Sequence, residues 1–315
     1  MKQIISIGVS SCLLGSEVRF DGGHKRDRFV TDILSEYFEF IPYCPELAIG
    51  LGIPRPTIRL ARIDGQIQLV EGDNYQHNYT DKMRQTADAY CLQLDNLCGH
   101  ILKSKSPSCG MTRVNLYEEN GHASKQGVGL FAESLMKKHP NLPVEEEGRL
   151  NDAGIRENFI ERVFAYHRWQ MMVAEGFAVN DLMNFHKQHK LTLLAHNEAI
   201  YRQLGRLVAQ STKDNLTDQA EEYIQLFSEA MSKHASRNSH VNVLQHIMGY
   251  LKQAIDSEDK QELLEIFEKY QLGELPLIVP VTLLRHHFRK HPNDYIQEQY
   301  YLNPYPGELM LRNHV

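Results

Sequence analysis

The sequence predicts an α/β domain, a mostly parallel sheet with helices on both faces, followed by a separate all-α domain. Strand and helix patterns alternate over about the first 150 residues, as they do in proteins built from β-α-β units. After Asn151 strand patterns almost vanish, and helical patterns follow one another. The acidic segment EEEGRLND interrupts the periodicity between the two halves. We therefore expect one domain at residues 1–148 and a second at residues 149–315.

Short apolar runs rich in β-branched residues indicate the strands of the first domain. These runs cover Ile4–Val9, Phe38–Tyr43, Gly99–Lys103 and Leu142–Glu145, and a hairpin over Thr57–Glu71 turns at Asp64 and Gly65. Apolar residues at helical spacing indicate the helices. They cover Asp27–Tyr37, Asn78–Asn96 and Val128–His139 in the first domain, and Arg156–Gly176, Asp181–Ser211, Thr217–Ala235, Ser239–Ser257, Lys260–Leu272 and Thr282–His291 in the second.

The composition is that of an ordinary globular protein. The chain has 315 residues, 42% of them hydrophobic and 23% charged, and a formal net charge of −6. This is enough apolar material to form full cores without disulfides. The negative charge excludes a generally basic nucleic-acid binder, but not a local basic surface. No apolar stretch reaches the length of a membrane span, and the N-terminal apolar run fits a strand better than a secretion signal. We expect a cytoplasmic protein without membrane association.

Three of the five cysteines follow predicted strands. An odd number of cysteines without a CxxC pair argues against a disulfide framework, a thioredoxin-like motif and a zinc ribbon. Cys12, Cys44 and Cys109 each come just after a strand. Because the carboxyl ends of parallel strands meet at one edge of a sheet, we expect these three to lie in one site. We expect Cys91 inside a helix and Cys98 just before a strand, at the opposite edge.

Three thiolates without a fourth suit a metal centre that has an open position. Four ligands normally saturate an iron–sulfur cluster, so three would leave one iron free to bind a substrate as a Lewis acid. Two other interpretations stay open at this point. The same thiolates could bind zinc, or the three cysteines could be small buried hydrophobic side chains.

The segments around these cysteines carry a specific resemblance. They read SSCLLGSEVRFDG, PYCPELAIGLGIPRP and KSKSPSCGM. They resemble the TudS-type thiouracil desulfidase family, whose pattern is SxCLLG…R(Y/F)DG, PxCPE…GL…PR and KxxSPSCG, and the resemblance covers residues 1–150. The second half, through FHKQHKLTLLAHNEAIYRQLGRLVA and PLIVPVTLLRHHFRK, resembles a helical domain of formerly unknown function that is commonly fused to it. Fused proteins of this kind resemble tRNA 4-thiouridine desulfidases.

The resemblance implies a cofactor and a reaction. Cys12, Cys44 and Cys109 would bind a [4Fe-4S] cluster that has three cysteine ligands and one open iron site. The soft thiocarbonyl sulfur of the substrate would bind that iron, and water would add to the polarised ring carbon. The result is a desulfidase without net redox change that converts 4-thiouridine in tRNA to uridine and releases sulfide. Its partner would be a thiolated tRNA or a thiopyrimidine.

Such a reaction needs a base for the water and a proton for the departing sulfur. Glu46 lies two residues beyond a ligand, so we expect it to be the general acid/base, with Ser106 orienting water or relaying a proton. The alternative for Glu46 is a buried ion pair with Arg55 or Arg19. The residues expected to contact the substrate are Arg19, Asp21, Ser108 and Lys103. Lys103 and Lys105 could hold a substrate phosphate, or could simply be solvated.

The helical half is not basic overall. Residues 151–315 contain 17 Lys and Arg against 21 Asp and Glu, so an RNA-binding surface would have to be a stripe. The candidates for this stripe are Lys187, Arg202, Arg206, Arg285 and Arg289. His186, His189 and His196 share one helix face. They could bind a metal, but we favour partly buried histidines on a core-facing stripe.

Three other functions compete with a tRNA desulfidase. One is a desulfidase of free thiouracil or thionucleosides. Another is an iron–sulfur redox or regulatory protein without turnover, for which a fourth protein ligand on the cluster would argue. The third is a non-catalytic RNA-binding protein whose thiolates hold structural zinc.

Overall fold

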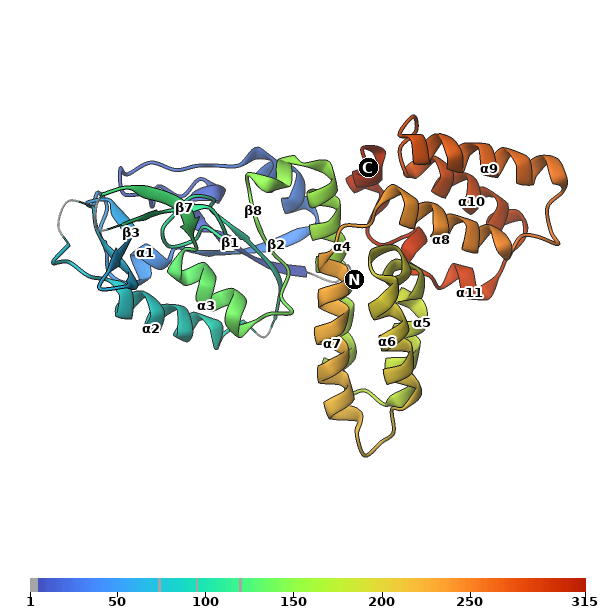
Figure 1. Cartoon of the computed structure of the whole chain (residues 1–315), viewed down its shortest axis with the longest axis horizontal. Coiled ribbons are helices and arrows are strands. Elements are labelled where there is room, and N and C mark those ends of the chain that lie inside the picture. Colours follow the sequence, from blue (N-terminus) through green and yellow to red (C-terminus); the bar gives the residue numbers. More distant parts are fainter. Residues whose placement is uncertain (1–4, 73–74, 95, 119–120) are drawn as a thin grey trace. The chain divides into compact units, whose positions relative to one another are not determined.

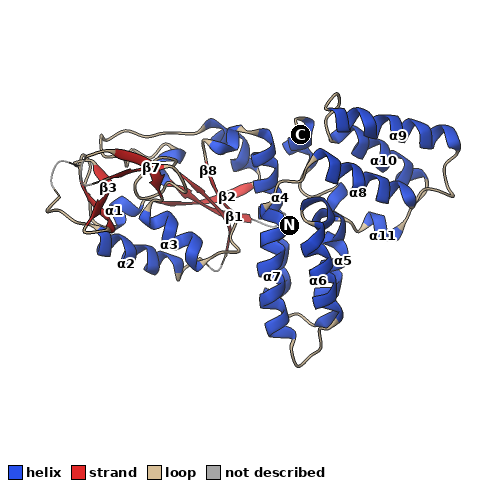
Figure 2. Cartoon of the chain, viewed as in Figure 1, coloured by secondary structure: helices blue, strands red, loops and turns tan. Residues whose placement is uncertain are grey.

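The computed structural model describes residues 5–72, 75–94, 96–118 and 121–315. The chain divides into two compact units, residues 1–151 and 152–315. The first unit contains two sheets with their helices, and the second is helical (Figures 1 and 2). The predicted fold class, an α/β region followed by an all-α region, is confirmed. No helix in the described ranges is long and apolar enough to cross a membrane.

The first sheet is entirely parallel, with the first strand inside it. In spatial order its strands are β2 (Phe38–Tyr43), β1 (Ile5–Ser10), β5 (Leu97–Leu102) and β8 (Val144–Glu146). From β1 the chain goes to β2 on one side and later to β5 on the other. This makes the carboxyl ends of these strands a topological switch point, where α/β proteins bind ligands. β1 and β5 are almost wholly buried, as expected for parallel strands in the interior of a sheet.

Two helices pack side by side against this sheet, α2 (Thr80–Cys91) and α3 (Leu130–Lys138) (Figure 1). Aromatic rings join them to the end of β2. The ring of Tyr43 stacks on Tyr90 of α2 at a centroid distance of 3.9 Å and on Phe131 of α3 at 5.3 Å. Stacked rings of this kind fix the end of β2 relative to both helices, and that end is where Cys44 follows.

The second sheet is mixed and was only half predicted. Its strands, in spatial order, are β4 (Gln66–Glu71), β3 (Ile58–Ile63), β6 (Val114–Tyr117) and β7 (Ala123–Gly127). The predicted hairpin is present, and Asp64 and Gly65 at its turn both have positive φ. β6 and β7 are absent from the prediction because β6 has only four residues and β7, ASKQG, contains no apolar residue larger than alanine.

The segment predicted to be a helix, residues 27–37, is helical over much of its length but is not a regular α-helix. The chain instead forms a π-helical turn at Phe29–Ile33 and a 3₁₀ turn at Leu34–Glu36. The Asp27 side chain accepts the backbone N–H of Val30 at 3.0 Å, and the Thr31 hydroxyl donates to the Asp27 carbonyl at 3.1 Å. Such side-chain bonds compete with the regular α-helical ladder, and β-branched residues weaken it further.

Three other boundaries differ from the prediction. The helix expected over residues 181–211 is two helices, because Asn197 is extended and its side chain caps the second one by accepting the N–H of Ile200 at 3.2 Å. The helix expected to reach residue 96 ends at Cys91, and Cys98 lies inside β5 rather than before it. Residues 4 and 95, which the predicted elements include, lie outside the described residues.

The helical unit packs around α5 (Val179–His196), which contributes to two cores. Leu182 and Phe185 belong to one core and Leu191 and Leu194 to the other. The remaining helices are α4 (Ala153–Ala174), α6 (Glu198–Ala209), α7 (Leu216–Ser232), α8 (Arg237–Gly249), α9 (Ser257–Leu272), α10 (Ile278–Lys290) and α11 (Asp294–Gln297). This unit ends in three short 3₁₀ turns, η5 (Tyr300–Leu302), η6 (Gly307–Leu309) and η7 (Leu311–Asn313). Two further 3₁₀ turns, η1 (Ser11–Leu14) and η4 (Arg149–Asn151), belong to the first unit.

A buried group of four charges joins α4, α5 and the C-terminal segment. Glu157 accepts from Arg312 Nε at 3.1 Å, and Glu161 lies 3.1 Å from His196 Nε2. His196 Nδ1 faces the carbonyl of Lys233 at 2.5 Å, so both ring nitrogens have acceptors. Burial alone would lower the pKa of His196, but the hydrogen bond to Glu161 and that carboxylate's charge outweigh it and raise the pKa. Two carboxylates thus balance two cations in the interior.

Replacing His196 with alanine is expected to lower the free energy of unfolding by about 3 kcal/mol near pH 6, because it removes the hydrogen-bonded partner of the buried Glu161 and leaves only Arg312, 3.5 Å away. Since the pKa of folded His196 is raised, this contribution is complete below about pH 6.5 and declines as the pH rises through the folded pKa. Urea denaturation of the full chain, followed by circular dichroism at about pH 6 and pH 9, measures both values. His246→Ala, at an exposed position on α8, is the control. An equal loss at both pH values would contradict the assignment.

Candidate metal centre at the sheet edge

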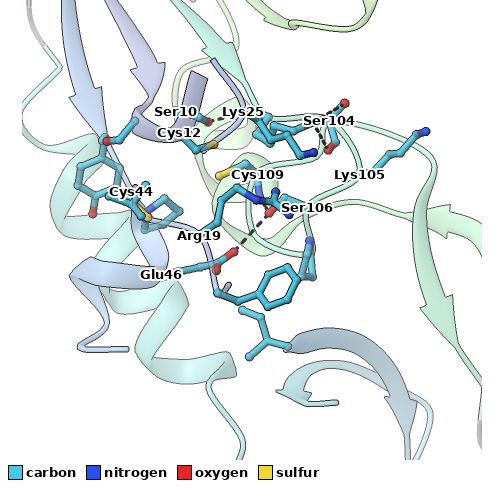
Figure 3. Close-up of a pocket in the computed structure, with 18 of the residues that line it drawn as sticks. Ser10, Cys12, Arg19, Lys25, Cys44, Glu46, Ser104, Lys105, Ser106 and Cys109 are labelled. Atoms are coloured by element: carbon cyan, nitrogen blue, oxygen red, sulfur yellow. Dashed lines mark hydrogen bonds between the residues drawn. The ribbon is translucent and has the colours of Figure 1, made fainter. Parts of the chain in front are cut away.

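A cavity of about 360 Å³ lies at the carboxyl ends of β1, β2 and β5. Cys12 lies in η1 just after β1, Cys44 directly follows β2, and Cys109 lies on the loop after β5. All three line this cavity, as the sheet topology predicts (Figure 3). Cys91 and Cys98 are buried and do not line it.

The three thiols resist ionisation as they stand. Burial raises the pKa of Cys12 to about 11, and it also raises the pKa of Cys44 and Cys109. The negative charge of the Cys44 thiolate adds to this effect on the pKa of Cys12, and the charges of Glu46, Cys44 and Cys12 add to it for the pKa of Cys109 in the order Glu46, Cys44, Cys12. Three thiolates here would therefore repel one another unless a cationic group bound them, and metal binding is the usual compensation.

The donor set fits a multinuclear cluster better than a single ion. No group of three or more His, Cys, Asp or Glu side chains in the described ranges is arranged to hold a metal ion. A zinc ion needs every thiolate at about 2.3 Å from one centre. In an iron–sulfur cluster the thiolates bind different iron atoms, so they surround a larger volume. Three cysteines spread around one cavity match the second requirement.

Glu46 lies at the same cavity and is fixed from both sides. It follows Pro45, which begins the short helix α1 (Pro45–Ala48). One carboxylate oxygen accepts from Arg55 Nη2 at 2.5 Å, and the other accepts from the Ser108 hydroxyl at 3.0 Å. The second oxygen also accepts from the Ser106 hydroxyl at 3.5 Å (Figure 3). The ion pair considered as an alternative is therefore present, and the Glu46 side chain also lines the cavity, with 16% of it exposed.

The two serines occupy different positions. Ser106 lines the cavity, and its hydroxyl oxygen accepts the backbone N–H groups of Ser108 and Cys109, each at 3.1 Å. Ser108, expected to contact substrate, is fully buried outside the cavity lining and holds the Glu46 carboxylate. Ser106 thus shapes the loop that presents Cys109, and Ser108 orients Glu46.

Acidic residues at the end of β8 brace the Cys109 loop, which the sequence analysis missed. Glu146 accepts the N–H of Met111 at 2.8 Å. Glu147 accepts the N–H of Ser104 at 2.7 Å and pairs with Lys103 Nζ at 2.5 Å. In the sequence this EEE run indicates only a domain boundary. Consecutive acids at the carboxyl end of a buried strand, the ligand-binding edge of a parallel sheet, were the available signal.

Of the other residues expected to contact the substrate, some line the cavity and one does not. Arg19 lines the cavity, while Asp21 lies outside the lining and pairs with Arg19 at 3.4 Å. Lys103 lines the cavity, but its charge is taken up by Glu147. Lys25 and Ser10 also line the cavity and were not expected there.

In the helical unit, two of the expected RNA contacts are already paired. Lys187 lies 2.6 Å from Glu298, and Arg202 lies 2.6 Å from Glu198 one turn away. Both pairs are on the surface, where such contacts contribute little to stability.

Arg285 and Arg289 differ from these two residues. They line a second cavity, of about 390 Å³, together with Phe288 and Leu302. Within the described ranges neither arginine has a carboxylate partner, and Arg206 on α6 also has none. The histidines of α5 are buried: His186 faces the Tyr223 hydroxyl at 3.2 Å and is not part of any metal-binding group of described residues.

Thiols gathered beside a carboxylate at a sheet switch point define a candidate metal-dependent enzyme. Comparison with known families gives two matches. The 2-thiouracil desulfurase family matches residues 7–147, and DUF1722, a family of unknown function, matches residues 190–306. The chain therefore belongs to the 2-thiouracil desulfurase family through its first unit, joined to a DUF1722 domain, which confirms the resemblance of the three cysteine loops.

Individual relatives match parts of the chain. Uncharacterized protein YbgA of Escherichia coli (strain K12) is 33% identical over 153 residues, 48% of this chain and 90% of its own length. Uncharacterized protein YbbK of Bacillus subtilis (strain 168) is 29% identical over 153 residues, 46% of this chain and 97% of its own. A solved structure of the [4Fe-4S]-dependent thiouracil desulfidase TudS is 30% identical, covers 47% of this chain and 93% of its own, and has a TM-score of 0.37.

Gly129→Ala is expected to destabilise the Cys109 loop. A Cβ at position 129 would lie 2.5 Å from the carbonyl carbon and oxygen of Ser108, and 2.9 Å from the Cys109 nitrogen. Backbone atoms cannot move aside cheaply, so we expect a loss of about 2 kcal/mol in the free energy of unfolding. Urea denaturation of the full chain measures it. Gly52→Ala, where a Cβ would meet nothing within 4 Å, is the matched control, and equal effects of the two substitutions would refute the packing argument.

Proposed function

We propose that this chain is a desulfidase that removes sulfur from 4-thiouridine in tRNA by hydrolysis, leaving uridine and sulfide. The observation that carries the proposal is the convergence of Cys12, Cys44, Cys109 and Glu46 on one cavity, in a chain of the 2-thiouracil desulfurase family. Thiopyrimidines are the substrates that this family's name indicates, and 4-thiouridine carries the same thiocarbonyl group.

Cys12, Cys44 and Cys109 would hold a [4Fe-4S] cluster as three thiolates. When bound, such a cluster supplies an iron without a protein ligand, a Lewis acid with affinity for soft sulfur. Within the described ranges no fourth cysteine lines the cavity, which supports catalysis over electron transfer.

Glu46 would remove a proton from the attacking water and return a proton to the departing sulfur. The Arg55 guanidinium holds one carboxylate oxygen, and the other oxygen faces Ser106 and Ser108. Both lone pairs of the Ser106 hydroxyl already accept backbone N–H groups. We therefore assign Ser106 to positioning Glu46 and the Cys109 loop, since a proton relay through it would break one of these bonds.

Support for an RNA substrate comes from the helical unit. Arg206, Arg285 and Arg289 are exposed and have no carboxylate partner in the described part of the chain. Unpaired arginines bind phosphates and stack on bases, and Phe288 and Leu302 give the cavity beside two of them an apolar lining. Free thiouracil or a thionucleoside is the alternative substrate, which the assay below separates.

The test is incubation of the anaerobically reconstituted full chain with tRNA that contains 4-thiouridine. We expect loss of the near-ultraviolet thiouridine absorbance and an equal amount of sulfide. Turnover of free 2-thiouracil and 4-thiouridine is measured in parallel. A protein that releases sulfide from the free compounds and not from tRNA would contradict the tRNA assignment, and one that takes up no iron would contradict the cluster.

Glu46→Gln is expected to keep the brown colour of the cluster and to lose turnover by at least about a hundredfold. Cys12→Ala, Cys44→Ala and Cys109→Ala should each lose colour and turnover together. Cys91→Ala is the matched control, because this cysteine is buried in α2 away from the cavity and should keep both. Full activity of Glu46→Gln would exclude the acid/base role, and bleaching of Cys91→Ala would exclude the ligand set.

A further inference from the structure

Ser10 lies at the junction between the first strand and the first cysteine loop. It is the last residue of β1 and directly precedes η1, which carries Cys12. A serine at this position usually caps the following turn with its hydroxyl oxygen, but Ser10 makes no side-chain capping bond. Ser10 is only 3% exposed and lines the cavity together with Cys12 and Cys109 (Figure 3). Its hydroxyl therefore serves contacts other than the local turn.

The Ser10 oxygen holds the start of the loop that carries Cys109. It accepts the backbone N–H of Lys103 at 3.0 Å. Lys103 directly follows β5, the parallel neighbour of β1, so this hydrogen bond joins the carboxyl ends of two adjacent strands. A hydroxyl that accepts in this way still has its own proton to donate, and a buried donor needs an acceptor.

The acceptor for this proton is the sulfur of Cys109. Burial is the main cause that raises the pKa of the Cys109 thiol, and the hydrogen bond from the Ser10 hydroxyl acts in the opposite direction and lowers it. Cys109 is itself only 5% exposed, so water competes little for this contact. A donor at this sulfur favours the thiolate, which is the form that binds a metal.

We infer that the Ser10 hydroxyl is hydrogen-bonded to the Cys109 thiolate of the loaded protein, and that it thereby controls how firmly the cluster is held and at what potential it is reduced. The inference rests on the proposed function, because it takes Cys109 as a cluster ligand. Hydrogen bonds to ligand sulfurs withdraw electron density from them and so raise the reduction potential of an iron–sulfur cluster. Ser10 is thus a positioning residue that acts through Cys109.

The test compares Ser10→Ala with the wild-type full chain after anaerobic reconstitution. We expect Ser10→Ala to lose iron to an excess of chelator about tenfold faster, because one hydrogen bond to a charged sulfur is gone. The reduction potential, measured by redox titration, should fall. The Fe–S(Cys) stretching bands of the resonance Raman spectrum should move to higher frequency. The last two measurements report electron density at the sulfur, which a merely structural role of Ser10 would leave unchanged.

Ser11→Ala is the matched control, since Ser11 is the next residue, is also buried and lines the same cavity. It should keep the wild-type potential and Raman bands, and so should Ser10→Thr, which retains the hydroxyl. An unchanged potential and spectrum in Ser10→Ala, or the same changes in Ser11→Ala, would overturn the inference.

The two proposals can fail separately. If Ser10→Ala shows the expected changes but no thiopyrimidine releases sulfide from the wild-type chain, the inference stands and the desulfidase proposal fails. If sulfide is released and Ser10→Ala has the wild-type potential and spectrum, the desulfidase proposal stands and the inference fails. A wild-type chain that takes up no iron overturns both.

Discussion

Mutual repulsion among three neighbouring thiolates is the constraint on which the candidate metal centre depends. Cys12, Cys44 and Cys109 come from three separate strand ends and face one cavity, where burial and their neighbours' charges oppose ionisation. A cationic cluster would relieve that repulsion and use the thiolates as ligands. The parallel sheet matters because its switch point is the place where loops from β1, β2 and β5 meet.

The loops around the cavity are held by a network of carboxylates rather than by packing alone. Glu46 receives hydrogen bonds from Arg55 and Ser108, while Glu146 and Glu147 receive backbone N–H groups of the Cys109 loop. The Cys109 loop donates hydrogen bonds to all three carboxylates, each of which comes from another part of the chain. Such a network fixes the side chains at the cavity before a ligand arrives, which is how a protein scaffold would assist the hydrolysis that we propose.

In the helical unit, buried ion pairs hold the C-terminal segment against the helices. Glu157 and Glu161 on α4 meet Arg312 and His196 in the interior, so the C-terminal segment is joined to the helices by paired ions. Buried pairs of this kind contribute little net stability, but losing one partner is costly, which makes them effective at fixing one arrangement. Arg285 and Arg289 are exposed instead, and they remain available to a ligand.

The sequence by itself determined the fold class, the hairpin and the strand ends that place the three cysteines. These features follow from local periodicity and from the motifs around each cysteine. Such local patterns can be read without knowing which distant residues are in contact. Only the tertiary structure decided that Lys103 is neutralised by Glu147 and that Ser108 is buried beneath Glu46. Pairing between residues about 40 to 60 positions apart leaves no periodic signal, because it depends on how separate strands and loops meet in space.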